Sequence, residues 1–168
     1  PTFGQMQIDV KEVATFVDLS LRMLEDSGNV EKEVREALAE DFGAKEATAF
    51  VNGGVGANSA TEPTGFMTAA GIAETNNGHA TVLAADALIN LFYAMPATYR
   101  NRGSWVMNGT TLATIRKLKD GQNNYLWQPA FVAGQPETIL GRPVVEVLDM
   151  PNVAAAATPI IFGDFKAG

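Results

Sequence analysis

The chain has 168 residues, of which 46% are hydrophobic and 18% are charged, a balance that supports a folded core and excludes a disordered polar chain. Its formal net charge is −7, which argues against a phosphate-binding protein, because such proteins normally carry a basic footprint. Cysteine is absent and His79 is the single histidine, so disulfides, thiol chemistry and histidine-rich metal sites are excluded.

The charge is unevenly placed along the chain. Residues 1–52 hold 11 acidic and 5 basic residues (net −6), whereas residues 53–168 hold 8 and 7 (net −1). In the acidic part, Met6, Ile8 and Val10 alternate with polar neighbours, which predicts a half-buried strand. The alternation slips near Lys11–Val13, where a bulge or bend is expected before the strand continues through Val13–Leu19. We therefore expect two parts of different character, divided near residue 52.

A long helix is predicted from Asn29, a good N-cap residue, to about Asn52. Its apolar positions recur every four residues, at Val30, Val34, Leu38 and Phe42. Glu31–Arg35 and Asp41–Lys45 are opposite charges four residues apart, a spacing that supports a helix. One narrow apolar stripe among many charges indicates a helix that lies along a surface and is not sunk in a core.

A polar, glycine-rich loop over residues 52–65 predicts a boundary between subdomains. A second helix is expected from near Thr81 until Pro96 ends it. Its inner side is formed by Ala84, Leu88, Leu91, Phe92 and Met95. Trp105–Met107 is typical of a short buried strand.

The last third of the chain mixes one more helix with two strands. Thr110 is expected to cap the helix TLATIRKLKD, whose inner face is Leu112, Ile115 and Leu118. Residues 144–148 and 159–163 have the composition of strands. Helices and strands alternate without a regular βαβ rhythm, so the predicted fold class is α+β.

Candidate reactive residues lack the neighbours that chemistry needs. The glycine-rich loop has Ser59 where a dinucleotide loop needs its third glycine, and residues 46–116 contain no lysine for a phosphate-binding loop. His79 has no nucleophile or orienting carboxylate in its local sequence. The acid pairs Glu25–Asp26 and Glu40–Asp41 fit a solvated helical face. We predict no catalytic residue, no cofactor and no metal.

The segment KLKDGQNNYLWQP (117–129) places lysines beside Tyr125 and Trp127, as single-stranded nucleic-acid binders do. Five cations form a candidate basic cluster: Arg100, Arg102, Arg116, Lys117 and Lys119. Three of them, Arg116, Lys117 and Lys119, are expected to share one helix whose other side is apolar, so they are explained equally well as its solvated face.

Residues 104–165 carry an ordered set of motifs that closely resembles the major capsid proteins of tailed bacteriophages, the Hong Kong ninety-seven type coat fold. The motifs are Val106–Asn108, Leu118–Asp120, Tyr125–Trp127, Leu140–Val145, Met150–Pro151 and Phe162–Phe165. In the N-terminal part, Leu24–Ser27, Phe50–Gly53 and Pro63–Gly65 are similar to the approach to that family's spine helix and the loop after it. Nine signature residues, taken as family markers or subunit contacts, follow from the resemblance: Asn108, Lys119, Asp120, Tyr125, Trp127, Gly141, Pro143, Phe162 and Asp164.

The resemblance implies a coat-fold fragment with a long spine helix and a mixed α+β axial domain. Residues 1–52 would be a remnant of the peripheral domain and residues 53–168 the axial domain. It also implies a major capsid subunit that is made in the host bacterial cytoplasm and ends in the virion. Its partners would be copies of itself, in hexamers and pentamers of the full-length protein, with no specific nucleic-acid binding and no membrane.

Segments typical of the family, the N-terminal arm, the extended loop and the strand after FGDF, are not found in this sequence, so the chain resembles a truncated coat subunit. We therefore expect a monomer or weak oligomer for these 168 residues alone, without the lysine–asparagine cross-links of some relatives. Three alternatives stay open: an encapsulin-type compartment shell, a small-ligand or nucleotide enzyme that uses the glycine-rich loop, and nucleic-acid binding through the basic cluster.

Overall fold

The structure, a computed structural model of the chain, describes residues 10–20, 22, 29–54, 61–126 and 137–166. The chain forms two compact units, Pro1–Ala70 (unit 1) and Gly71–Gly168 (unit 2). The division falls later than the boundary expected near residue 52, because the stretch after the long helix bonds back to it. The amides of Phe66 and Met67 donate to the carbonyls of Phe50 and Val51, at 2.9 and 3.0 Å.

Unit 1 is built around helix α2, Val30–Val51, whose bounds agree closely with the predicted helix. Only its end residues Val30 and Val51 are buried, which fits a helix that lies along a surface. The Glu31–Arg35 pair forms, at 2.5 Å, but no ion pair joins Asp41 and Lys45 within the described helix. Asn29 occupies the N-cap position without a capping hydrogen bond from its side chain.

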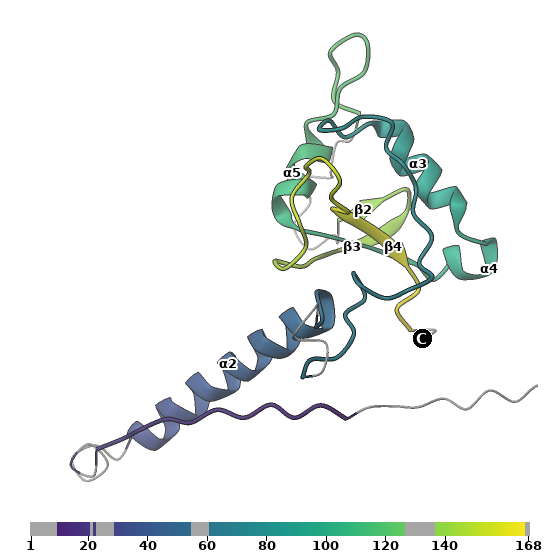
Figure 1. Cartoon of the computed structure of the whole chain (residues 1–168). Coiled ribbons are helices and arrows are strands. Elements are labelled where there is room, and N and C mark those ends of the chain that lie inside the picture. Colours follow the sequence, from purple (N-terminus) through teal and green to yellow (C-terminus); the bar gives the residue numbers. More distant parts are fainter. Residues whose placement is uncertain (1–9, 21, 23–28, 55–60, 127–136, 167–168) are drawn as a thin grey trace, which may run out of the picture. The chain divides into compact units, whose positions relative to one another are not determined.

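Residues 10–20 run beside α2 as an extended segment (Figure 1, purple). They form neither helix nor strand, so the strand predicted through Val13–Leu19 does not form. Alternating hydrophobicity predicts a strand only where a second strand supplies hydrogen bonds, and the described residues of unit 1 supply none. A shallow groove separates the segment from the helix; it is lined by Thr15, Val17, Val34, Ala37, Leu38 and Asp41.

The end of α2 is held by two glycines whose backbones touch. A Cβ built on Gly53 would lie 2.0 Å from the Gly65 nitrogen, and one built on Gly65 would lie 2.4 Å from the Gly53 nitrogen. Gly53 also adopts a φ of +65°, in the left-handed region that favours glycine. The motifs Phe50–Gly53 and Pro63–Gly65 are therefore one piece of structure, in which only residues without a side chain fit.

Unit 2 contains a four-stranded mixed sheet in the order β2-β3-β1-β4. The strands are β1 (Ser104–Met107), β2 (Thr138–Ile139), β3 (Arg142–Glu146) and β4 (Ile160–Gly163). Central β1 pairs in parallel with β3, with Trp105 opposite Val144, and antiparallel with β4, with Trp105 opposite Phe162. The predicted strands near 105–107, 144–148 and 159–163 are confirmed, although β3 begins two residues earlier than expected; β2 was not predicted.

Three helices accompany the sheet: α3 (Ala85–Ala94), α4 (Ala97–Arg100) and α5 (Gly109–Arg116). Helix α3 ends before Pro96, as predicted, and packs Leu88 and Phe92 inward. Helix α4 is a single turn that the sequence pattern did not reveal. Helices and a small mixed sheet together confirm the α+β class.

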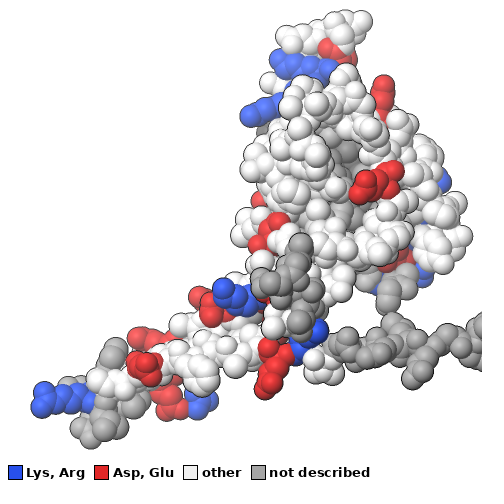
Figure 2. All heavy atoms as spheres, viewed as in Figure 1, with Lys and Arg blue, Asp and Glu red and all other residues white. Residues whose placement is uncertain are grey.

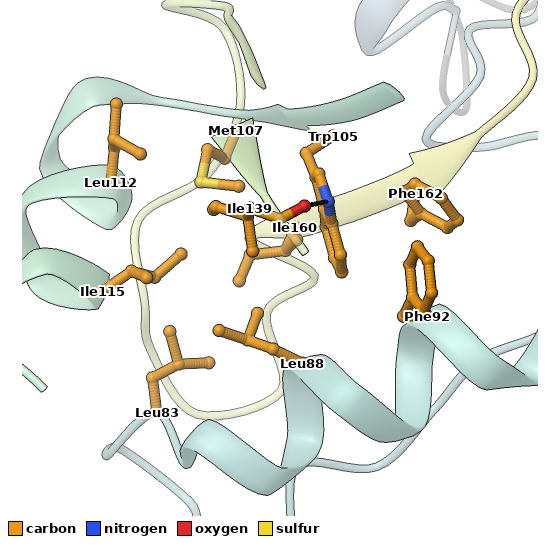
Figure 3. Close-up of a cluster of buried hydrophobic side chains, with 10 residues drawn as sticks. All are labelled: Leu83, Leu88, Phe92, Trp105, Met107, Leu112, Ile115, Ile139, Ile160 and Phe162. Atoms are coloured by element: carbon orange, nitrogen blue, oxygen red, sulfur yellow. Dashed lines mark hydrogen bonds between the residues drawn. The ribbon is translucent and has the colours of Figure 1, made fainter. Parts of the chain in front are cut away.

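The core of unit 2 lies between α3, α5 and the sheet (Figure 3). Its buried members are Leu83, Leu88, Phe92, Trp105, Met107, Leu112, Ile115, Ile139, Ile160 and Phe162. The Trp105 ring is fully buried, with its centroid 4.6 Å from that of Phe162, and its indole nitrogen donates to the Ile139 carbonyl at 2.9 Å. This hydrogen bond fixes β2 against the core, because the donor would otherwise be buried without a partner.

Among the described helices, none is both long enough and apolar enough to cross a bilayer.

Candidate functional site

The signature residues do not gather around one reacting point. In the described parts of the chain, no group of three or more His, Asp or Glu side chains is placed to hold a metal ion. His79 lies exposed in a bend that precedes α3. The described signature residues instead hold the backbone, fill the core or form exposed turns, and each is placed by a different element.

Asn108 is the buried junction of unit 2. It lies at the N-cap of α5, where its side-chain oxygen accepts from the Thr111 amide at 2.7 Å. Its side-chain nitrogen donates to the Met150 carbonyl and to the Asn152 side chain, both at 2.8 Å. The prediction that Thr110 caps this helix is wrong, because an asparagine that directly follows a buried strand reaches the free amide first.

Phe162 and Asp164 place the FGDF motif in the wall of the core. Phe162 is buried, and its ring lies so close to Gly103 that a Cβ there would come within 2.6 Å of it. The Asp164 side chain is 4% exposed, and its carboxylate lies 3.0 Å from Nε of Arg102. This contact is an ion pair without a directed hydrogen bond, while the other carboxylate oxygen accepts from the Lys166 amide at 3.2 Å.

Gly141 lies in the turn that joins β2 to β3, and Pro143 lies in β3 just after that turn. Thr138 pairs with Pro143 and Ile139 with Arg142, so the connection is the two residues Leu140 and Gly141. Both have positive φ, 50° and 73°, as a tight type I′ hairpin requires. Gly141 accepts this conformation at no cost, and it therefore sets the register in which β2 meets β3.

Lys119, Asp120 and Tyr125 form an exposed hairpin, residues 118–126, which we call the Asp120 hairpin. The Leu126 amide donates to the Leu118 carbonyl at 3.0 Å, and Lys119 pairs with Tyr125 through an isolated bridge. The Lys119 ammonium lies 4.9 Å from the centroid of the Tyr125 ring, and it donates to the Asn123 side chain at 3.0 Å. The cation and the ring hold one another in place.

The Asp120 carboxylate organises the tip of this hairpin. It accepts from the amides of Asn124 and Gln122, at 2.8 and 2.9 Å, and from the Asn124 side chain at 3.2 Å. Hydrogen bonds from Asn124 are the main reason that the pKa of Asp120 lies below its usual value, because they stabilise the charged form. Asp120 and Gly121 therefore do more than end a helix, since the Asp120 carboxylate accepts the hydrogen bonds that stabilise the following turn.

The basic cluster predicted from the sequence is divided among different elements. Helix α5 ends at Arg116, which forms an ion pair with Glu137, and Lys117 is the residue after the helix. Lys119 lies in the Asp120 hairpin, so the prediction that it shares a helix with Arg116 and Lys117 is wrong. The reason is the pairing of Lys119 with Tyr125, which draws the chain out of helical conformation. Trp127 lies outside the described residues.

Two arrangements were missed because their partners are far apart in the sequence. Arg102 meets Asp164, and Arg142 donates to the backbone carbonyl of Asn101 and, at 3.1 Å, to its side chain. No local pattern predicts either contact. An arginine beside a turn and an aspartate after a buried strand are common, and only the sheet order brings them together.

The described signature side chains thus stabilise turns, the core and an exposed hairpin. The model of the phage capsid family matches residues 1–168, and the chain belongs to that family. The family resemblance that the motifs predicted is confirmed. Family membership indicates a structural, non-enzymatic protein.

Two solved structures are similar to this chain. They are the capsid of an empty GTA (gene transfer agent) particle and the capsid of a native GTA particle, both computed with C5 symmetry. The identities are 38% and 37%, the TM-scores are 0.73 and 0.75, and both matches cover 87% of this chain. Both cover 53% of the capsid chain, so this chain spans about half the length of those relatives. A comparison with curated proteins gave no match.

Proposed function

We propose that this chain is part of the major capsid subunit of a phage-like particle, whose copies assemble into an icosahedral shell that encloses DNA. The observation that carries the proposal is the family match over residues 1–168, joined to 37–38% identity with the capsids of two GTA particles. Copies would meet in hexamers and pentamers, and the finished subunit would reside in the virion after synthesis in the host bacterial cytoplasm.

Exposed apolar side chains on both units support self-association. In unit 1, the Val10 and Phe16 side chains are each 93% exposed. In unit 2, Leu148 is 88% exposed, and Tyr125 and Leu126 of the Asp120 hairpin are 52% and 54% exposed. Single apolar residues on a surface are ordinary, whereas adjacent ones, such as Tyr125 and Leu126, provide contiguous apolar surface of the kind that marks interaction sites. In a shell, that partner is another copy of the same subunit.

We propose that the two units take the roles expected for the peripheral and axial parts of the subunit. Unit 1, with its long exposed helix α2, is proposed as the peripheral part that carries the spine helix. Unit 2, with its sheet and the Asp120 hairpin, is proposed as the axial part, which meets its copies near the ring centres. The boundary after Ala70 replaces residue 52 in this proposal, because the Gly53–Gly65 contact ties residues 63–65 to the end of α2.

The proposal is tested by producing the complete coding sequence that contains this chain and separating the product on a density gradient. Electron microscopy of the fast-sedimenting fraction should show closed shells that contain peptides of residues 104–119. Residues 1–168 alone, run in parallel, should sediment as a monomer or weak oligomer. If the complete product stays at the top of the gradient under all assembly conditions, the proposed function is wrong.

A further inference from the structure

Three arginine side chains surround the turn between α4 and β1. Arg100 donates twice to the Met95 carbonyl, from Nε at 3.1 Å and from Nη2 at 3.0 Å. Arg142 donates to the backbone and the side chain of Asn101. We call Tyr93, Arg100 and Arg142 the arginine turn; the third arginine, Arg102, pairs with Asp164.

The charges of the arginine turn meet no carboxylate among the described residues of unit 2. Among the ion pairs of the described residues, Arg102 is the only one of the three arginines that has a carboxylate. Arg100 and Arg142 bond carbonyl oxygens, which fix their position but leave their positive charge uncompensated. A guanidinium has five N–H donors, so both keep donors for a further partner. A fixed guanidinium loses little side-chain entropy on binding, because its position is already set.

An exposed aromatic ring completes the surface. Cζ of Arg100 lies 4.7 Å from the centroid of the Tyr93 ring, and the Tyr93 side chain is 62% exposed. Tyr93 in turn meets the buried Phe92 edge to face, with centroids 5.3 Å apart. Arginine and tyrosine are the residues that most often dominate the binding energy of interfaces. Held against the core by Phe92, this pair forms a rigid contact point.

Helix α2 carries the complementary charge. Glu33, Glu36 and Glu40 recur at intervals of three and four residues, so they share one face of the helix, opposite the apolar stripe. All three are exposed, and Figure 2 shows red side chains recurring along α2. Within this stripe only Glu36 has an ion pair among the described residues, at 3.7 Å from Lys32. We call the three glutamates the acidic stripe; like charges three and four residues apart on a helix repel one another.

We propose that the arginine turn of one subunit docks on the acidic stripe of α2 in a second copy of the chain. The inference rests on the proposed function, since it requires copies to meet in a shell. Bidentate pairing of arginine with carboxylate would fix the orientation of the contact. The exposed Tyr93 ring would cover the aliphatic parts of the glutamate side chains, which keeps water from the ion pairs.

The test is a charge swap in the complete subunit, with the threshold concentration for shell assembly measured by light scattering. Arg142→Glu and Glu40→Arg should each raise the threshold about tenfold, because each places like charges across every contact. The double variant should return it to near the wild-type value. Lys117→Glu makes the same charge change outside the arginine turn, and it should leave the threshold unchanged.

The outcomes separate this inference from the function on which it rests. If wild-type subunits form shells and both single variants assemble as well as wild type, the arginine turn does not dock on α2 while the proposed function stands. If the swaps alter only the retention of DNA in the shells, the partner is nucleic acid and the inference is wrong. If wild-type subunits form no shells, both fail. Where a variant does not fold, a density map of wild-type shells decides, by whether Arg142 lies within about 4 Å of a neighbour's glutamate.

Discussion

The side-chain amide of Asn108 donates a hydrogen bond of 2.8 Å to the carbonyl of Met150, and so ties the start of α5 to the turn that precedes β4. The same side chain accepts from the Thr111 amide at 2.7 Å. Asn108 is itself 7% exposed, so water cannot replace either bond. One residue therefore satisfies both the free amide of a helix and the carbonyl of a distant turn, which explains why it belongs to the motif.

Replacing Asn108 with alanine should lower the unfolding free energy of unit 2 by about 2–4 kcal/mol, the sum of a lost helix cap and a buried carbonyl left without a donor. Both tryptophans of the chain lie in unit 2, so denaturation followed by tryptophan fluorescence measures this unit. Asn108→Ser should lose less, because it keeps the capping acceptor. Asn90→Ala, on the exposed side of α3, is the matched control and should change little. An equal loss for Asn90→Ala and Asn108→Ala would contradict the role given to Asn108.

Replacing Thr111 with valine should raise the unfolding free energy of unit 2, opposite to the effect of Asn108→Ala. Its side chain is fully buried, and its hydroxyl oxygen has no hydrogen-bond partner among the residues that the structure describes. Thr111→Val keeps the shape and removes the unpaired polar group, so we expect unit 2 to become more stable by about 1 kcal/mol. The same fluorescence measurement checks this. A loss of more than about 1 kcal/mol would show that the hydroxyl makes a bond that valine cannot replace.

Replacing Gly53 with alanine should disrupt the structure locally at the end of α2. Gly53→Ala places a methyl group against the backbone of Gly65, at a φ of +65° that alanine disfavours. The segment 63–67 should then separate from the helix, and the amides of Phe66 and Met67 should lose hydrogen-exchange protection. Gly43→Ala is the matched control in the same unit. Its Cβ meets nothing within 4 Å, so it should stabilise α2 by about 0.5–1 kcal/mol. Unchanged protection in Gly53→Ala would mean that the two glycines do not touch.

Asp120 predicts a pH dependence of the hairpin. Hydrogen bonds from Asn124 hold the pKa of this carboxyl below its ordinary value, so the charged form favours the folded hairpin. The charged Asp120 carboxylate therefore stabilises the folded hairpin fully at a pH above the ordinary carboxyl pKa. This stabilisation is lost as the pH falls through the lowered pKa that Asp120 has in the folded hairpin. The Asn124 amide signal in NMR spectra should titrate with a midpoint below that of an ordinary aspartate carboxyl. Asp120→Asn should abolish that titration, and a midpoint above the ordinary value would show that Asp120 does not hold the turn.

The sequence predicted the elements whose signals are local. Helix α2 was found from Asn29 and a stripe at every fourth residue, and strand β1 from its run of apolar residues. The strand expected over residues 13–19 shows the limit of this reasoning, because alternation describes a face and does not supply a partner strand. Strand β2 has two residues and exists only through its pairing with β3, so no periodicity could reveal it.

The candidate site was predictable only as a set of motifs. Asn108, Asp120 and Phe162 were identified by family resemblance, but their physical roles depend on contacts across the fold. The ion pair of Arg102 with Asp164 and the hydrogen bonds of Arg142 to Asn101 depend on sheet order. The sequence pattern extends the helix to Lys119. In the structure Lys119 instead pairs with Tyr125 across the Asp120 hairpin, and the helix ends at Arg116.

A density map of particles purified from cells that make the complete subunit would show whether this chain forms the shell wall. We expect closed shells in which the fold of unit 2 repeats around five-fold and six-fold positions, with side-chain density that matches Trp105, Asn108 and Phe162. Particles whose walls are built from a different chain, with this one absent or present only as an unassembled monomer, would contradict it.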